Sequence, residues 1–220
     1  MKNIIIGIIV FAVVLLTSQI AQAQGTIYVS SLDQTTTGNY AAGSNSWLAV
    51  LFRTGPNSGG YTLDSIELGM ANASGSPSGF TVMIYSPSLS DLGAFPGSSV
   101  DTLDGSLNPT TAGVYTYTSA SNLTLSASTD YFIVLTSATA IASGAYEWNI
   151  TSTFSPSLSG GWGGDNIFAN SSNGSSWGYV LGAYPQFSID AIPIPEPCVL
   201  ALSGLGGLLL LWHRRKSKVV

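Results

Sequence analysis

Paired carboxylates are the first residues of this chain whose spacing could do chemistry. Asp64 and Glu67 could serve as the two acids of a glycosidase, in which one carboxyl group protonates the leaving group and the other acts as nucleophile or base. Both lie in the strand-like segment YTLDSIELGM, and residues three apart on a regular strand point to opposite faces of the sheet. The pair would need a bulge to converge, so we predict no catalysis there.

A second segment with two acids is DTLDG. Its residues Asp101, Asp104 and Gly105 could contribute carboxylate and carbonyl oxygen ligands to a calcium loop. The segment lacks the regularly repeated acids of an EF-hand, and a solvent-exposed Asx turn accounts for the same residues. We therefore predict no cofactor. Calcium held by acids that are distant in the sequence is the open alternative.

Two tryptophans stand among small residues, where a flat ring could stack on a sugar. Trp162 lies in SGGWGGD and Trp177 in NGSSWGY, both outside the strand-like segments. These two rings are the candidate glycan-stacking residues. The alternative is that they cover the ends of the fold, whereas Trp47 and Trp148, which lie on strand-like segments, are expected in the core.

Residues 24–192 lack most of the side chains that enzymes use. The only histidine, His213, and the only cysteine, Cys198, lie near the C-terminus, and Arg53 is the only lysine or arginine within this range. Ser-His-Asp and Cys-His catalysis, zinc binding through His or Cys, lysine Schiff bases, P-loops and disulfides are therefore excluded there. We predict that the protein is not an enzyme.

The charge of the same range is strongly negative. All eleven acidic residues except Glu196 lie within it, so its net charge is about minus nine, compared with minus five for the whole chain. A surface of this sign repels phosphates, and we exclude nucleic acid as a partner.

The sequence pattern of residues 24–192 predicts strands, and these strands must position the side chains described above. Segments rich in β-branched and aromatic residues alternate with period two between Gly, Pro, Asn and Ser clusters, and no convincing helical period occurs in 24–192. The predicted strands are 46–53, 61–70, 80–86, 114–118, 130–137, 146–150 and 186–192. We expect an all-β fold of eight to eleven short strands, forming a single two-sheet β-sandwich or jelly roll.

The N-terminus resembles an export signal. Lys2 supplies a positive start, residues 4–16 are almost continuously apolar, and Ala21-Gln22-Ala23 offers small residues at the two positions that signal peptidase requires. We predict a signal peptide over residues 1–23, with a mature chain that begins at Gln24. A retained membrane anchor is the alternative.

The C-terminal residues 193–220 combine three features. Pro193, Pro195 and Pro197 hold the chain extended, and the fifteen residues 198–212 are apolar, giving a helix of about 22 Å that is short for a hydrocarbon core of about 30 Å. Four basic residues follow the apolar run: Arg214, Arg215, Lys216 and Lys218. We expect them to stay in the cytoplasm and so to halt export of the chain. We expect a short transmembrane helix in a membrane-bound precursor.

The order of Pro195-Glu196-Pro197, short helix and basic tail is similar to the PEP-CTERM sorting signal of Gram-negative bacteria. The resemblance implies that Pro195, Glu196 and Pro197 are recognised by an exosortase, which cleaves the tail. The chain departs from the usual pattern at Cys198, where serine or threonine is common. Cys198 is either acylated or simply a small apolar residue. A plain type I tail anchor and a GPI signal are the alternatives for the whole segment.

The segments SWLAVLF, YTLDSIELGM, GFTVMIYS and LTLSASTDYFIVLTS, with a late NGSSW, resemble the choice-anchor domains of bacterial surface proteins, with the R type as the nearest. The resemblance covers most of 24–192. It implies a β-sandwich in a family whose molecular activity is mostly unassigned.

These observations predict an exported, exosortase-sorted protein of the cell surface or extracellular matrix, with a structural or adhesive role. Its expected partners are the exosortase, the inner membrane transiently, and exopolysaccharide. One alternative is a carbohydrate-binding module for exopolysaccharide, and an outlying one is a carboxylate-based glycosidase.

Overall fold

The computed structural model describes residues 25–90, 93–105, 108–164 and 167–195, with side-chain detail lacking at 89, 90 and 93. Several predicted features lie outside these ranges: the signal peptide with Ala21 and Ala23, the motif residues Glu196 and Pro197, the apolar run 198–212, and the basic group Arg214, Arg215, Lys216 and Lys218. Within the described ranges, no helix is long and apolar enough to cross a membrane.

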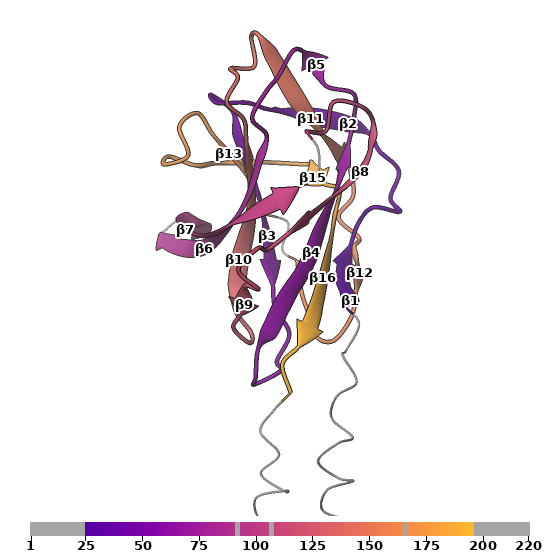
Figure 1. Ribbon diagram of the computed structural model, residues 1–220, viewed down its shortest axis with the longest axis vertical. Helices are drawn as coiled ribbons and strands as arrows, with labels where there is room; N and C mark the ends of the chain where they lie inside the picture. Colours follow the sequence, from indigo (N-terminus) through magenta and orange to yellow (C-terminus); the bar gives the residue numbers. More distant parts are fainter. Residues whose placement is uncertain (1–24, 91–92, 106–107, 165–166, 196–220) are drawn as a thin grey trace, which may run out of the picture.

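The described residues form strands, turns and loops and contain no helix, which confirms the all-β prediction (Figure 1). The strands are β1 Thr26–Ser30, β2 Gly38–Ala42, β3 Trp47–Arg53, β4 Tyr61–Met70, β5 Ser74–Gly75, β6 Thr81–Ser90, β7 Gly93–Gly105, β8 Gly113–Thr118, β9 Thr124–Leu125, β10 Asp130–Thr136, β11 Gly144–Thr151, β12 Ser157–Leu158, β13 Phe168–Ser171, β14 Gly178–Val180, β15 Tyr184–Pro185 and β16 Phe187–Pro193.

All seven predicted strands are present, and β4 has the predicted bounds. The additional strands are short or lack apolar alternation. β7, with the sequence GAFPGSSVDTLDG, is the longest of them at 13 residues. Its Gly, Pro and Ser residues are turn signals, so the sequence pattern did not indicate a strand there.

The strands are antiparallel and form one hydrogen-bonded sheet rather than two separate sheets. The main path runs β12-β1-β16-β4-β8-β7-β6-β10-β3-β13-β14, and β11 joins β2, β5 and β15 to β4. β7 makes the connection between the halves, because it pairs with β6 along most of its length and then with β8 through Asp104 and Gly105. A strand shared in this way lets the sheet fold back on itself without an open edge at the corner.

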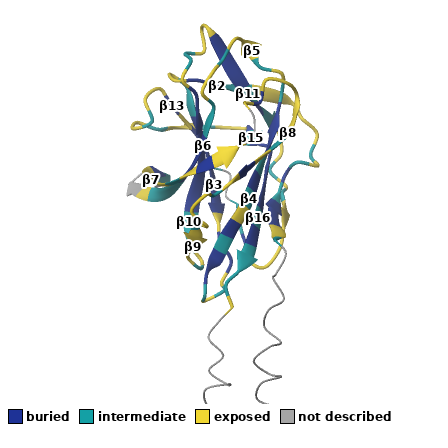
Figure 2. Ribbon diagram, in the orientation of Figure 1, coloured by how far each residue is buried: buried dark blue, intermediate teal, exposed yellow. Residues whose placement is uncertain are grey.

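The main core lies between the two halves of this sheet. β3 contributes Leu48, Val50 and Phe52, and the opposite half contributes side chains such as Ile66 of β4 and Ile189 of β16. These side chains are at most 2% exposed, and buried residues lie along the strands of both halves of the sheet (Figure 2).

The outer face of β3 and β10 is also buried, and this was not expected. Ala49, Leu51, Met83, Phe132 and Val134 form a second apolar cluster. Half-buried side chains from the surrounding segments pack over it: Trp47, Tyr85, Ala94, Ile167 and Trp177. Burial on both faces explains why β3 and β10 read as nearly continuous apolar runs.

Trp162 is a core residue whose ring packs against aromatic side chains of β1, β3 and β4. Its ring stacks on Tyr28 at 4.8 Å between ring centroids and on Phe52 at 6.1 Å, and it meets the ring of Tyr61 edge-on at 4.9 Å. The side chain is 3% exposed. This aromatic cluster ties three strands to the loop that carries Trp162.

Replacing Trp162 by alanine should lower the free energy of unfolding of the mature protein by about 3–5 kcal/mol, because it removes a large ring from a packed cluster. The exposed variant Leu181→Ala should change it by less than about 0.5 kcal/mol, since that side chain is 89% exposed. Urea unfolding measures both. A loss below about 1 kcal/mol for Trp162→Ala would contradict this assignment.

Candidate functional site

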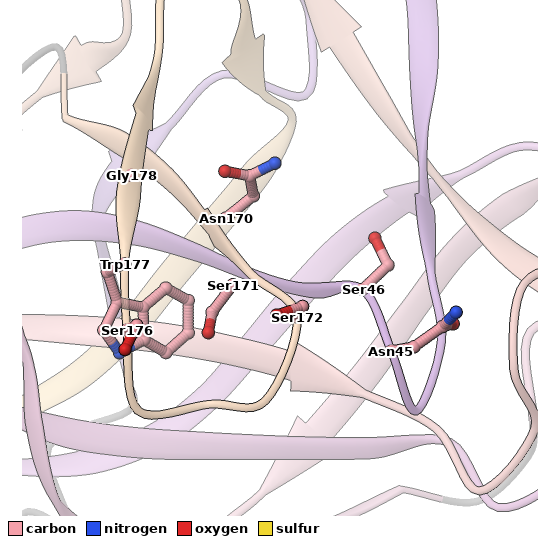
Figure 3. Close-up of a pocket in the computed structure, with 8 residues that line it drawn as sticks. All are labelled: Asn45, Ser46, Asn170, Ser171, Ser172, Ser176, Trp177 and Gly178. Carbon is pink, nitrogen blue, oxygen red and sulfur yellow. The ribbon is translucent and has the colours of Figure 1, made fainter.

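A hollow of about 370 Å³ lies on the surface beside Trp177 (Figure 3). It is lined by serine and asparagine side chains, one glycine and one aromatic ring: Asn45, Ser46, Asn170, Ser171, Ser172, Ser176, Trp177 and Gly178. None of these side chains carries a charge. We call this feature the Trp177 hollow.

Two turns from distant parts of the sequence form its walls. The turn between β2 and β3 is closed by the pair Gly43 and Ser46, whose backbone N–H groups each donate to the other's carbonyl oxygen, at 2.9 and 3.1 Å. The loop between β13 and β14 forms the other wall. The two turns are adjacent because β13 pairs with β3, with Ser171 opposite Trp47.

The loop between β13 and β14 is held by its own hydrogen bonds. The hydroxyl of Ser171 accepts the N–H of Gly174 at 2.9 Å, and the side-chain oxygen of Asn173 accepts the N–H groups of Ser175 at 2.9 Å and Ser176 at 3.0 Å. Gly174 has a φ of +72°, and a Cβ there would stand 2.9 Å from the Trp47 ring. These contacts hold the wall formed by this loop without any ligand.

Trp177 connects the hollow to the interior. Its ring is half-buried and packs over the outer apolar cluster, while its six-membered ring points toward Ser171 in Figure 3. The indole N–H is buried and has no hydrogen-bond partner among the described residues. A flat ring with hydroxyl and amide groups around it matches the alternating apolar faces and hydroxyl edges of a sugar.

A second hollow of about 340 Å³ lies between the segment after β1 and the end of β11, lined by residues such as Asp33, Gln34 and Thr153. It has no aromatic ring in its lining. The Trp177 hollow is the better candidate site because it offers both a stacking surface and hydrogen-bonding groups.

The structure buries the other candidate glycan-stacking ring, Trp162. The Trp162 side chain is 3% exposed and its ring stacks on Tyr28 and on Phe52, so the ring is not accessible to a sugar in this structure. The glycines around Trp162 suggested an exposed loop. Tyr28 explains the difference, because it comes from β1, which the sequence pattern did not predict. Trp148 is fully buried, as predicted, and Trp47 is half-buried.

The structure contains the bulge that Asp64 would need. Ser65 pairs with Asp190 and Leu63 with Ala191, so Asp64 is an extra residue in β4. The bulge brings Asp64 to Asp190, and their carboxylate oxygens stand 2.6 and 2.5 Å from the point that a Cβ on Gly25 would occupy. Neither hollow is lined by Asp64, Glu67 or Asp190.

The surroundings of Asp190 disfavour the ionised form of its carboxyl group. Burial raises the pKa of its carboxyl group above the ordinary value; the negative charge of Asp64 raises it further and that of Glu67 adds to it, while the N–H of Ala191 opposes them. One carboxylate oxygen of Asp190 is buried without a hydrogen-bond partner. Among the described residues, no group of three or more acids, histidines or cysteines could hold a metal ion.

Asp101 lies in β7, opposite Ile84 of β6, and hydrogen bonds use both of its carboxylate oxygens. One accepts the N–H of Thr102 at 2.9 Å, and the other accepts the hydroxyl groups of Ser119 and Ser121. Asp104 is exposed and pairs with Thr118 at the end of β7. DTLDG is therefore the end of strand β7, and not the solvent-exposed Asx turn that the sequence predicted.

Of the sorting motif, only Pro195 is described, and it is exposed. The residue before it, Ile194, is half-buried against the loop 57–60.

The hollow residues Asn45, Ser46, Asn170 and Ser171 were not predicted as site residues. The segment ANSSNGSS, residues 169–176, is one of the Asn- and Ser-rich clusters that predict a turn, and the pairing that brings it beside Asn45 is not visible in the sequence.

The sequence matches no family model and no curated protein. The resemblances described above therefore stay predictions.

Replacing Asp190 by asparagine should stabilise the mature protein at neutral pH. A carboxyl group whose pKa is higher in the folded than in the unfolded state destabilises the fold where it is ionised, so the cost is fully present above the folded pKa and vanishes below the ordinary value of 3.8. The melting temperature of Asp190→Asn should therefore exceed that of the parent at pH 7, with a gain that shrinks toward pH 3.5. The exposed variant Asp104→Asn should show no such gain; an equal gain in both variants would contradict the role of burial.

Proposed function

We propose that this chain is an exported, exosortase-sorted protein of the Gram-negative cell surface or extracellular matrix, in which a non-catalytic β domain has a structural or adhesive role. The order of export signal, domain, proline motif, short apolar segment and basic tail supports the sorting part of the proposal. The exosortase is then the processing partner, and the inner membrane holds the precursor only transiently.

The place where the described chain begins and ends is compatible with this role. Thr26 at the start of β1 pairs with Ala191 near the end of β16, so both ends of the described chain leave the same end of the sheet (Figure 1). We call this end the membrane pole. The Trp177 hollow lies at the start of β3, whereas β3 ends at Arg53 beside Gly163 in the aromatic region near that pole. A membrane-bound precursor would hold the hollow away from the bilayer.

The domain proposed is residues 24–192, a two-layered β-sandwich of the choice-anchor R type, followed by the sorting segment 193–220. The core between the two halves of the folded sheet supports the sandwich description. Its stability rests on packing and on strand hydrogen bonds.

A second function, binding of exopolysaccharide, is favoured by the Trp177 hollow. The lining offers hydroxyl and amide groups that both donate and accept hydrogen bonds, and it contains no cation to pair with a carboxylate or sulfate. Arg53 is the only cation of 24–192, and it pairs with Asp130 at 3.2 Å. The polymer that fits is therefore neutral, such as one of hexose or N-acetylhexosamine units, rather than a uronate.

Changing both Pro195 and Pro197 to alanine should stop release of the protein from the membrane of its native host. Hydrophobicity of the apolar segment is unchanged, so the precursor should still insert, but the residues that the exosortase is proposed to recognise are lost. Fractionation and mass spectrometry of the C-terminus measure this. Release at the parental rate, or a mature chain that keeps Arg214 to Val220, would favour a plain tail anchor.

Trp177→Ala should weaken binding of the mature protein to neutral glycans on an array by about tenfold or more, as expected for a tryptophan at the centre of a binding surface. Trp177→Phe keeps a ring and should retain more of the binding. Uronate polymers should not bind either form. If no neutral glycan binds the parent protein, or if Trp177→Ala binds as well as the parent, the structural role stands alone.

A further inference from the structure

The residue that precedes the sorting motif is held by a loop of the folded sheet. Ile194 follows the last residue of β16, and its N–H donates to the carbonyl oxygen of Gly60 at 3.0 Å. The side-chain amide of Asn57 donates to the carbonyl oxygen of Ile194, also at 3.0 Å, and to that of Gly60. Both backbone polar groups of Ile194 are thus used by the loop 57–60.

Within residues 193–195, only Ile194 can both donate and accept a backbone hydrogen bond. Its neighbours Pro193 and Pro195 have no backbone N–H. Ile194 therefore carries the only backbone N–H donor between Ile192 and Glu196. Because a residue before proline is restricted to extended conformations, fixing Ile194 also fixes the direction in which Pro195 leaves.

The loop is shaped for this close approach. A Cβ on Gly59 would collide with the carbonyl oxygen of Ile194, so the contact requires glycine at this position. The N–H of Gly60 closes the turn by donating to the carbonyl oxygen of Asn57 at 2.8 Å, and the N–H of Asn57 donates to the hydroxyl of Tyr61 at 3.3 Å. Since Tyr61 belongs to the aromatic cluster around Trp162, the loop is tied to the core.

We propose that Asn57 is a positioning residue for exosortase processing: with Gly59 it fixes the exit direction of the chain, so that the folded domain presents the sorting motif at a set place on the membrane pole. This inference rests on the proposed sorting function. Glu196 is two residues beyond Ile194, and two extended residues reach at most about 7 Å. The peptidase must therefore bind the motif beside the loop 57–60, and a motif already held in one direction loses less freedom on binding.

The test follows release of the full-length protein in its native host by pulse-chase. Asn57→Ala should slow release about three- to tenfold, the range expected from losing side-chain hydrogen bonds that restrict the substrate. Asn57→Asp has nearly the same volume but no N–H donor, so it should slow release at least as much. Gly59→Ala should do the same by pushing Ile194 away.

Asn72→Ala is the matched control. Asn72 also bonds to backbone through its side chain, accepting the N–H of Ala112 at 2.9 Å, but it follows Met70 at the opposite end of β4 from the membrane pole. Its release should match the parent. Hydrogen exchange at the Ile194 amide should be faster in the Asn57 variants and unchanged in Asn72→Ala, which separates loss of the grip from general loss of stability.

The outcomes separate this inference from the proposal that it rests on. If the double proline variant stops release but both Asn57 variants are released at the parental rate or faster, sorting stands and the positioning role is overturned. If the double proline variant is released normally, the sorting function itself fails. Slower release of the Asn57 variants with an unchanged melting temperature supports the positioning role.

Discussion

Burial of both faces of β3 and β10 is the constraint on which much of this architecture depends. A sheet with one wet face needs only one apolar layer, but here the outer face carries its own cluster of Ala49, Leu51 and Phe132. That cluster must be covered, and the loop with Trp177 and segments near β7 cover it. The Trp177 hollow exists because the loop that shields the outer cluster also turns back beside the Asn45 turn.

The sequence predicts the apolar strands well and the rest less well. β4 was predicted to the residue because apolar residues recur from its first residue to its last, and β3 and β10 were predicted to within one residue because their apolar runs are long. β7 was not predicted, since its 13 residues are held by pairing on two sides rather than by their own composition. Because β7 pairs with both β6 and β8, the structure has one hydrogen-bonded sheet where the sequence pattern predicted two.

Bulges account for the main errors about individual side chains. β1 skips Tyr28 in its pairing with β16, so Tyr28 and Val29 are both buried and the period of two is broken. Tyr28 then covers Trp162, which the sequence suggested as an exposed ring. On the other side of β16, the bulge at Asp64 turns a carboxylate toward Asp190. No local pattern reveals such an insertion, because its position depends on the partner strand.

The two ends of the strand path are very short. β12 has two residues and β14 has three, so each forms only a short edge. Exposed long edges are templates on which copies of a chain add to one another as fibres. Short edge strands of this kind lower the tendency of copies of a chain to stack in an amyloid-like way when they are crowded together.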